Sequence, residues 1–157
     1  DIAYRMITKE EFPSYGYEIA HGATSVWEDF RRVDDAPISR NHHFFCDYIS
    51  WFMKNLIGLN VNPYRRNPNE FLLAPKFIAA LDHAEATYNA PAGEVRISWK
   101  RDGEDILYSV TLPEGAKAEI ALEAGWQFDV GFTHKRFTGT TEFRIIPESK
   151  KDKYCHV

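Results

Sequence analysis

The sequence predicts an α+β fold in two parts, a helical part followed by an antiparallel β-sandwich. Three observations lead to this prediction. Before residue 60, apolar residues recur at helical spacing. From about residue 71, the chain breaks into short apolar segments bounded by Gly, Pro, Asp or Asn, which is typical of a sandwich. The stretch between them, residues 61–70, has neither pattern, so we interpret it as a linker.

A first helix is expected over residues 8–21. Thr8 and Glu11 have the spacing of a capping box at its start. Pro13 suits a first helical turn, so the alternative is a helix that begins near Pro13 and runs to His21. Gly22 would end either helix. Glu18 lies on this helix, where we expect it to be solvated or paired.

The clearest helix is predicted over residues 42–58. Its apolar residues step by 4, 3, 4 and 3 positions and so form one buried face, namely Phe45, Ile49, Phe52, Leu56 and Leu59. Gly58 and the Asn-rich run after it would end the helix. This face needs partner helices that the sequence does not contain. We therefore expect dimerisation through exposed helices, or contact with the remainder of a larger parent domain.

Seven strands are predicted after the linker, over residues 71–74, 84–89, 94–100, 106–112, 118–122, 127–130 and 141–146. Val95, Ile97 and Trp99 alternate with polar residues, as in a half-buried strand. Turns are expected at Arg101-Asp-Gly103 and Pro113-Glu-Gly115. The sandwich therefore spans residues 71–147, and residues 148–157 form a polar tail.

Composition excludes several classes of function. A net charge of -4 gives no electrostatic basis for binding nucleic acid or an anionic membrane. No run approaches the roughly 18 apolar residues of a membrane span. Cys46 is expected to be a buried free thiol, and Cys155 is too distant to form a scaffold with it. The chain begins with Asp and reads as mid-protein sequence, so we expect a fragment whose compartment stays undetermined.

Two neighbouring motifs carry the candidate chemistry. Gly22-Ala-Thr-Ser-Val-Trp-Glu28 places a carboxylate beside an indole, and Ser39-Arg-Asn-His-His-Phe44 adds imidazoles. A carboxylate, an aromatic ring and an imidazole suit one half of a sugar-hydrolysing pocket. Metal binding is not expected, because His42 and His43 are adjacent rather than four apart and Asp34-Asp35 supplies too few oxygens. No cofactor is predicted.

A series of motifs resembles the C-terminal part of the bacterial α-L-rhamnosidases of glycoside hydrolase family 78. They occur in the family's order, namely Pro13-Ser-Tyr-Gly-Tyr17, Gly22–Glu28, Asn41-His42, Phe71-Leu-Leu-Ala-Pro75, Ala84–Lys100 and Val110-Thr-Leu-Pro113. The resemblance implies that residues 1–60 are the last helices of an (α/α)6 catalytic barrel, followed by the β-sandwich. It also implies hydrolysis of terminal α-L-rhamnose from glycosides or polysaccharides, with inversion.

The resemblance assigns roles to three residues. Glu28 matches the general base that activates water, and His42 matches a histidine that contacts sugar hydroxyls. Trp27 is expected either to form a wall of the sugar pocket or to pack between barrel helices. Asp29 and His43 depart from the family's usual residues, which could shift substrate preference. The general acid belongs to an earlier barrel segment that this chain lacks, so the chain alone is expected to be inactive.

A second hypothesis is a stand-alone carbohydrate-binding or structural support module in which the sandwich acts. Trp99, Trp126 and Tyr88 on the predicted strands motivate it, because aromatic rings stack on sugars. The alternation of Trp99 with Val95 and Ile97 argues against it, since that pattern directs the indole into the core.

Overall fold

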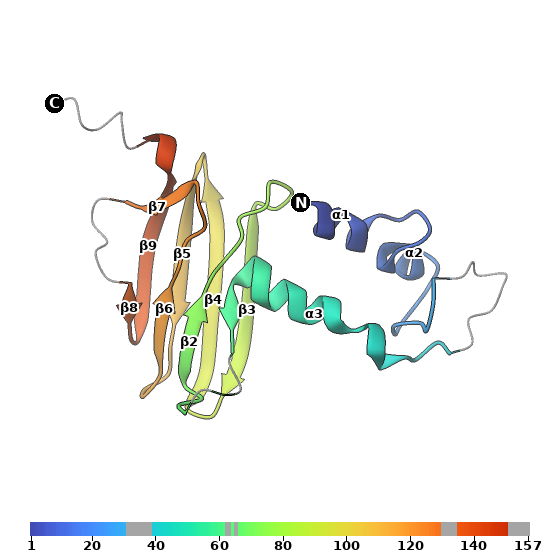
Figure 1. Ribbon diagram of the computed structural model, residues 1–157, viewed down its shortest axis with the longest axis horizontal. Coiled ribbons are helices and arrows are strands. Elements are labelled where there is room, and N and C mark those ends of the chain that lie inside the picture. The colour runs from blue at the N-terminus through green and yellow to red at the C-terminus, as the bar shows by residue number, and fades with distance from the viewer. Residues whose placement is uncertain (31–38, 62–63, 65, 130–134, 151–157) are drawn as a thin grey trace. The chain divides into compact units, whose positions relative to one another are not determined.

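The computed structural model describes residues 1–30, 39–61, 64, 66–129 and 135–150 (Figure 1). It divides into two compact units, residues 1–51 and the residues from 52 onward. Helices make up the first unit, and the second holds all the described strands. The predicted α+β class, helices before a sandwich, is therefore confirmed. Asp34-Asp35, Cys155 and the tail beyond residue 150 lie outside the described residues.

The first unit begins with two short helices, α1 (Ile2–Thr8) and α2 (Tyr15–Ala20). The predicted capping box at Thr8 is wrong, because Thr8 ends α1 instead of starting a helix. Ser14 caps α2: its Oγ accepts a hydrogen bond from the Tyr17 N–H at 2.9 Å. The alternative start near Pro13 is thus the better prediction, and α2 ends just before Gly22 as expected.

Residues 43–57 are helical, but not as one regular α-helix. The segment consists of a 3-10 turn η2 (His43–Phe45), the helix α3 (Asp47–Trp51) and the π-helix η3 (Phe52–Ile57). The predicted apolar face divides along its length. Its first residues, Phe45 and Ile49, are 40% and 53% exposed, whereas Leu56 and Leu59 are buried in the second unit. Cys46 is half-buried, so the expectation of a buried thiol is corrected.

The end of η3 is tied to the sandwich through its carbonyl groups. A helix leaves its last carbonyls without partners inside the helix. Here strands β4 (Gly93–Asp102) and β5 (Asp105–Thr111) and the connection after β2 (Glu70–Leu73) supply the donors. The bonds are Lys76 N–H to Asn55 O at 2.7 Å, Trp99 Nε1–H to Leu56 O at 2.8 Å, Tyr108 Oη–H to Ile57 O at 3.1 Å and Ala74 N–H to Gly58 O at 2.8 Å. The π-helix η3 is therefore a structural part of the second unit.

Two sheets form the second unit. The four-stranded sheet has the order β1-β2-β6-β8, and the five-stranded sheet has the order β3-β4-β5-β9-β7. Their strands are β1 (Leu59–Asn60), β2 (Glu70–Leu73), β3 (His83–Ala90), β4 (Gly93–Asp102), β5 (Asp105–Thr111), β6 (Lys117–Ile120), β7 (Trp126–Phe128), β8 (Arg136–Phe137) and β9 (Thr140–Pro147). A 3-10 turn, η4 (Glu148–Lys150), follows β9. All seven predicted strands are present, and β1 and β8 are additional.

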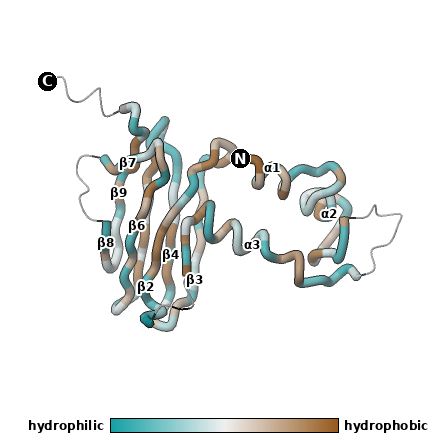
Figure 2. Tube along the Cα trace, in the orientation of Figure 1, coloured by the Kyte–Doolittle hydropathy of each residue, from teal (hydrophilic) through white to brown (hydrophobic). Residues whose placement is uncertain are grey.

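The core is built by alternation along the strands. Val95, Ile97 and Trp99 on β4 are buried, and the residues between them are half-buried or exposed, as predicted. The hydropathy of the strands changes accordingly from residue to residue (Figure 2). The Asp102-Gly103 turn joins β4 and β5 as a hairpin, with Gly103 at φ +64°. The turn at Pro113-Glu-Gly115 instead carries the chain from the five-stranded sheet to β6 of the other sheet.

One pairing departs from the antiparallel pattern. Strand β2 pairs with β6 in parallel, with Phe71 opposite Ala118 and Leu73 opposite Ile120. Because all four side chains are buried, this pair supplies the inner face of the four-stranded sheet. The other strand pairs of the described residues are antiparallel.

Candidate functional site

The segment that carries Glu28 is held by backbone hydrogen bonds, although it is neither helix nor strand. The Glu28 N–H donates to the Ser39 carbonyl at 2.9 Å, and the His42 N–H donates to the Val26 carbonyl at 2.8 Å. The Ser25 hydroxyl also donates to the Arg40 carbonyl. These bonds run between two short stretches, residues 25–28 and 39–42. The two sequence motifs that carry the candidate chemistry are therefore neighbours in the first unit.

Glu28 and His42 lie on these two paired stretches, and both side chains are half-buried. Two backbone hydrogen bonds fix the stretches relative to each other. The carboxylate and the imidazole therefore belong to two paired segments of backbone. His42 stands at the entrance of η2, with its ring 5.1 Å from that of Phe44 between centroids. The arrangement places a proton acceptor and an imidazole with two hydrogen-bonding nitrogens in one region.

Trp27 is buried in the first unit, with only 4% of its surface exposed. The guanidinium of Arg40 lies over its ring, 5.4 Å from the centroid, which is a cation–π geometry. Its ring thus packs within the unit, and its backbone joins directly to Glu28. Arg40 was not among the sequence candidates, because an exposed arginine in a loop carries no pattern that would single it out.

Glu18 is the residue that sequence reasoning missed. Instead of being solvated or paired, it is 2% exposed, and no ion pair holds it among the described residues. Its Oε2 accepts a hydrogen bond from the Trp27 N–H at 3.3 Å. Burial, and secondly the charge of Asp29, raise the pKa of this carboxyl above its ordinary value, against the opposing effect of that hydrogen bond.

Aromatic side chains surround this region. The Tyr15 ring lies 4.4 Å from the Tyr48 ring and 5.0 Å from the Phe30 ring, and the Tyr15 hydroxyl donates to the Phe45 carbonyl at 2.9 Å. Burial raises the pKa of both tyrosines, and the charge of Glu18 adds to the effect. These contacts attach the α2 helix to the segment that follows His42.

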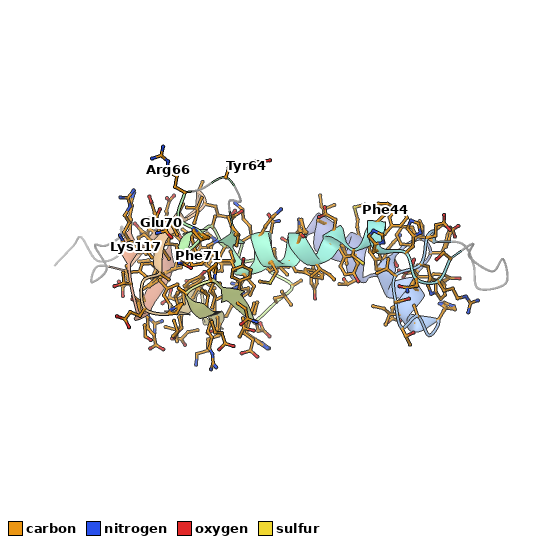
Figure 3. The ribbon with its side chains drawn as sticks, turned by 90° about the horizontal axis from the view of Figure 1, so that it is seen from below. Phe44, Tyr64, Arg66, Glu70, Phe71 and Lys117 are labelled. Carbon is orange, nitrogen blue, oxygen red and sulfur yellow. The ribbon has the colours of Figure 1, made fainter. Side chains whose placement is uncertain are left out.

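Apolar side chains are also exposed on the first unit. The large ones are Ile2, Met6, Phe12, Ile19, Phe44, Phe45 and Ile49. Phe44, next to the His42-His43 pair, is 74% exposed (Figure 3). Large apolar side chains left exposed in this number are typical of a region that another part of a protein covers.

Metal and membrane features are limited in the part of the chain that the structure describes. It contains no group of three or more His, Cys, Asp or Glu side chains arranged to hold a metal ion. Among the same residues, none of the helices has the length and apolar character needed to cross a membrane.

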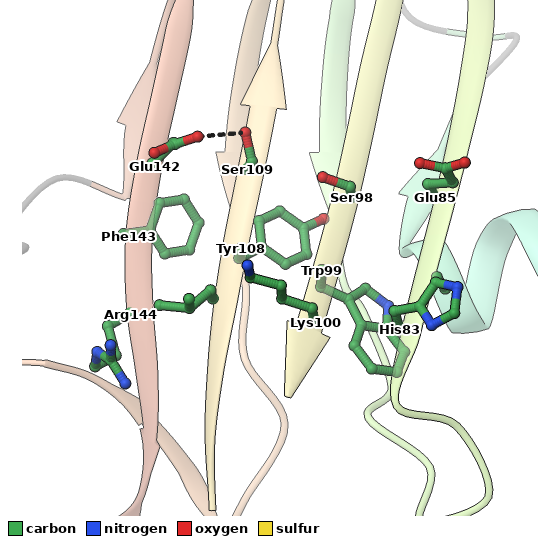
Figure 4. A pocket seen from close by; sticks show the side chains of 12 residues that line it. His83, Glu85, Ser98, Trp99, Lys100, Tyr108, Ser109, Glu142, Phe143 and Arg144 are labelled. Carbon is green, nitrogen blue, oxygen red and sulfur yellow. Dashed lines mark hydrogen bonds between the residues drawn. The ribbon is translucent and has the colours of Figure 1, made fainter. Parts of the chain in front are cut away.

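A hollow of about 650 Å³ lies on the five-stranded sheet, and polar side chains such as Glu85, Ser98 and Ser109 line it (Figure 4). Trp99 also contributes to its lining, but the indole is 2% exposed and its Nε1–H is bonded to Leu56 O. The ring T-stacks on Phe77 in the core, and so does the ring of Trp126. Trp99, the first aromatic residue that motivated a carbohydrate-binding sandwich, is therefore unavailable for stacking on a sugar.

The helical unit and the sandwich correspond to two consecutive domains of one class of enzyme. Residues 1–56 match the family model of the bacterial alpha-L-rhamnosidase six-hairpin glycosidase domain. Residues 61–135 match the model of the bacterial alpha-L-rhamnosidase C-terminal domain. The chain thus belongs to the bacterial alpha-L-rhamnosidase family, as a C-terminal portion.

Known alpha-L-rhamnosidases are similar to the chain over nearly its whole length. One from Formosa agariphila is 28% identical over 96% of this chain and 17% of its own length. One from Streptomyces avermitilis is 26% identical over 87% of this chain and 14% of its own length. The chain therefore spans only a small part of these relatives.

Solved structures share the fold. The alpha-L-rhamnosidase from Dictyoglumus thermophilum superposes with a TM-score of 0.73 at 23% identity, over 92% of this chain and 19% of that one. The Streptomyces avermitilis alpha-L-rhamnosidase complexed with L-rhamnose gives a TM-score of 0.69 at 23% identity, over 94% of this chain and 15% of that one.

Proposed function

We propose that this chain is part of an inverting glycoside hydrolase that removes terminal α-L-rhamnose from glycosides or polysaccharides. Glu28 is its general base. The observation that carries the proposal is the pairing of residues 25–28 with residues 39–42, which holds Glu28 beside the His42 stretch. The two family matches support the class of enzyme.

The proposed reaction needs two carboxyl groups, separated by about 6.5–9.5 Å in inverting enzymes. Glu28 takes a proton from a water molecule, and the oxygen of that water attacks the anomeric carbon. The glycosidic bond breaks as an acid protonates the leaving oxygen, and the product has the opposite anomeric configuration. We assign this acid to a part of the protein outside the chain. His42 would hold a sugar hydroxyl, and Trp27 would form the wall behind Glu28.

The same proposal assigns the domains. Residues 1–60 are the last helices of an (α/α)6 barrel, residues 61–70 a linker, residues 71–147 the sandwich and residues 148–157 a polar tail. The exposed apolar side chains of the first unit support contact with the remainder of the barrel. Alone, the chain would cover them by pairing with a second copy, which light scattering after size-exclusion chromatography would detect as a dimer.

Substitution of Glu28 by Gln in the full-length protein tests the base. An amide does not accept a proton from water, so hydrolysis of an aryl α-L-rhamnoside should fall by about 10²- to 10⁴-fold with the fold intact. Asp29→Asn is the matched control, because it neutralises the adjacent acid; it should keep most of the activity. Retained turnover in Glu28→Gln, or a loss confined to Asp29→Asn, would remove Glu28 from the mechanism.

Two further measurements test the reaction itself. Proton NMR of early product should show the β anomer of rhamnose before mutarotation, since inversion is proposed; an α anomer would contradict it. Purified residues 1–157 should not release rhamnose at enzyme-like rates, because the proposed acid lies elsewhere. Such release by the chain alone would contradict the division of the site between two segments.

A further inference from the structure

The most unusual group in the described chain is the Glu18 carboxyl. It is buried on α2, and its Oε1 has no hydrogen-bond partner among the described residues. A buried ionised carboxylate without a cation is strongly disfavoured, because it loses its hydration and gains nothing in return. A buried carboxyl that persists in such a place is expected to be uncharged.

Among the described residues, no cationic group stabilises a negative charge on Glu18. Asp29, from the loop that follows Glu28, adds repulsion. Among the described residues, Tyr15 from the same helix and Tyr48 from α3 are the other titratable groups coupled to it; the pKa of each is raised, so both hydroxyls stay protonated at neutral pH and supply no positive charge. In the part of the chain that the structure describes, the Trp27 N–H is the one group that favours the anion, and that bond is 3.3 Å long. A neutral acid keeps it, because its carbonyl oxygen accepts from the same N–H.

We infer that Glu18 is a positioning residue for the general base: as an uncharged acid, it holds the Val26–Trp27 peptide, directly before Glu28, from the side of helix α2. This inference rests on the proposed role of Glu28. Both polar groups of the Val26–Trp27 peptide are then fixed, since its N–H is bonded to Glu18 and its carbonyl accepts from the His42 N–H. Without the bond to Glu18, the Val26–Trp27 peptide can tilt, and the Glu28 carboxylate that follows it shifts away from its water.

The kinetic test compares two substitutions in the full-length protein. Glu18→Met keeps the length of the side chain but removes the acceptor, so kcat should fall by about 10- to 100-fold, as for a displacement of about 1 Å at a catalytic group. KM should change little, because Glu18 does not touch the sugar in this proposal. Glu18→Gln keeps a neutral acceptor and should recover most of the lost kcat.

Glu10→Gln, at an exposed position of the same unit, is the matched control and should behave as the wild type. Unchanged kcat in Glu18→Met, with a native circular dichroism spectrum, would overturn the positioning role. If kcat fell as far in Glu18→Gln as in Glu18→Met, the inference that Glu18 acts as an uncharged acid would be wrong. A neutral acceptor would then be unable to replace the ionisable carboxyl.

An infrared measurement makes the test independent of activity. At neutral pH the wild type should show a carboxylic acid C=O band that disappears in Glu18→Gln and persists in Glu10→Gln; absence of that band would refute the inference. This readout holds even if Glu18→Met does not fold. It also separates two failures: retained hydrolysis in Glu28→Gln would refute the proposed base, whereas the infrared band reports on Glu18 alone.

Discussion

The hydroxyl of Tyr108 offers the sharpest test of how the sandwich holds the end of η3. Tyr108→Phe removes one oxygen and leaves the ring, which stacks on Phe143 at 5.2 Å between centroids. What is lost is the hydrogen bond that the hydroxyl donates to the Ile57 carbonyl. Both residues are buried, so water does not readily take the place of the hydroxyl.

The size of the effect follows from the geometry of that bond. A buried acceptor left without its donor costs about 1–3 kcal/mol. The Oη···O distance of 3.1 Å is long for a hydroxyl donor, which places the value in the lower part of that range. We expect Tyr108→Phe to lower the free energy of unfolding by about 1–2 kcal/mol. Urea unfolding of the full chain, followed by near-UV circular dichroism, should show a lower midpoint with an unchanged m-value.

Tyr88→Phe is the control for this change. Tyr88 lies on the same sheet, and its hydroxyl forms no hydrogen bond among the described residues. Its substitution should alter the free energy of unfolding by less than about 0.5 kcal/mol. Equal effects of the two substitutions would refute the reasoning, because the bond to Ile57 would then contribute nothing measurable.

Three further outcomes are expected for the same chain. Ser14→Ala should destabilise the first unit by about 1–2 kcal/mol, because it removes the cap of α2. Thr8→Ala, the control, should cost less than about 0.5 kcal/mol. Thermal unfolding of the two variants measures the difference in stability. Gly58→Ala should cost about 2–4 kcal/mol, since φ is +86° and a Cβ would collide with the backbone of Ala74 and Pro75. Gly103→Ala, where a Cβ would meet open space, should cost about 1 kcal/mol; the urea midpoints of the two variants test the difference. Burial raises the pKa of Tyr108 above its ordinary 10.0. The contribution of the protonated hydroxyl to the free energy of unfolding is therefore complete below pH 10 and falls by about 1.4 kcal/mol per pH unit above pH 10. Tyr108→Phe should flatten this alkaline decline, and an unchanged slope would contradict the prediction.

The strands could be predicted because their side chains alternate in a way that burial enforces. Val95, Ile97 and Trp99 follow a period of two, and that period alone orients β4. The parallel pairing of β2 with β6 has no comparable signal, since either direction buries the same residues. Strands β1 and β8 are two residues long, too short for any periodicity.

The helical part was harder to predict because apolar side chains at the same helical spacing lie in different environments. Leu56 is buried against the sandwich, whereas Ile49, at the same helical spacing, is exposed on the first unit. Thr8 and Glu11 had the spacing of a capping box, but Ser14 provides the cap through its bond to the Tyr17 N–H. Spacing identifies which residues share a face and leaves open what covers it.

The candidate site was partly predictable for the same reason. The motif around Glu28 is contiguous, and its pairing with the His42 stretch uses backbone groups close in the chain. Glu18 lacked such a signal, because a single acid on a six-residue helix is usually solvated. Ser14, four residues before Glu18, caps the helix and is also buried, but both facts come from the structure and not from the sequence pattern.

The attachment of η3 has a consequence for grafting experiments between related enzymes. A junction placed at residue 61, where the match to the C-terminal domain begins, would separate the sandwich from Leu56, Ile57 and Leu59. The donor would leave part of its core behind, and the indole of Trp99 would point at a foreign main chain. The transplantable piece therefore starts at Phe52, where the second compact unit begins.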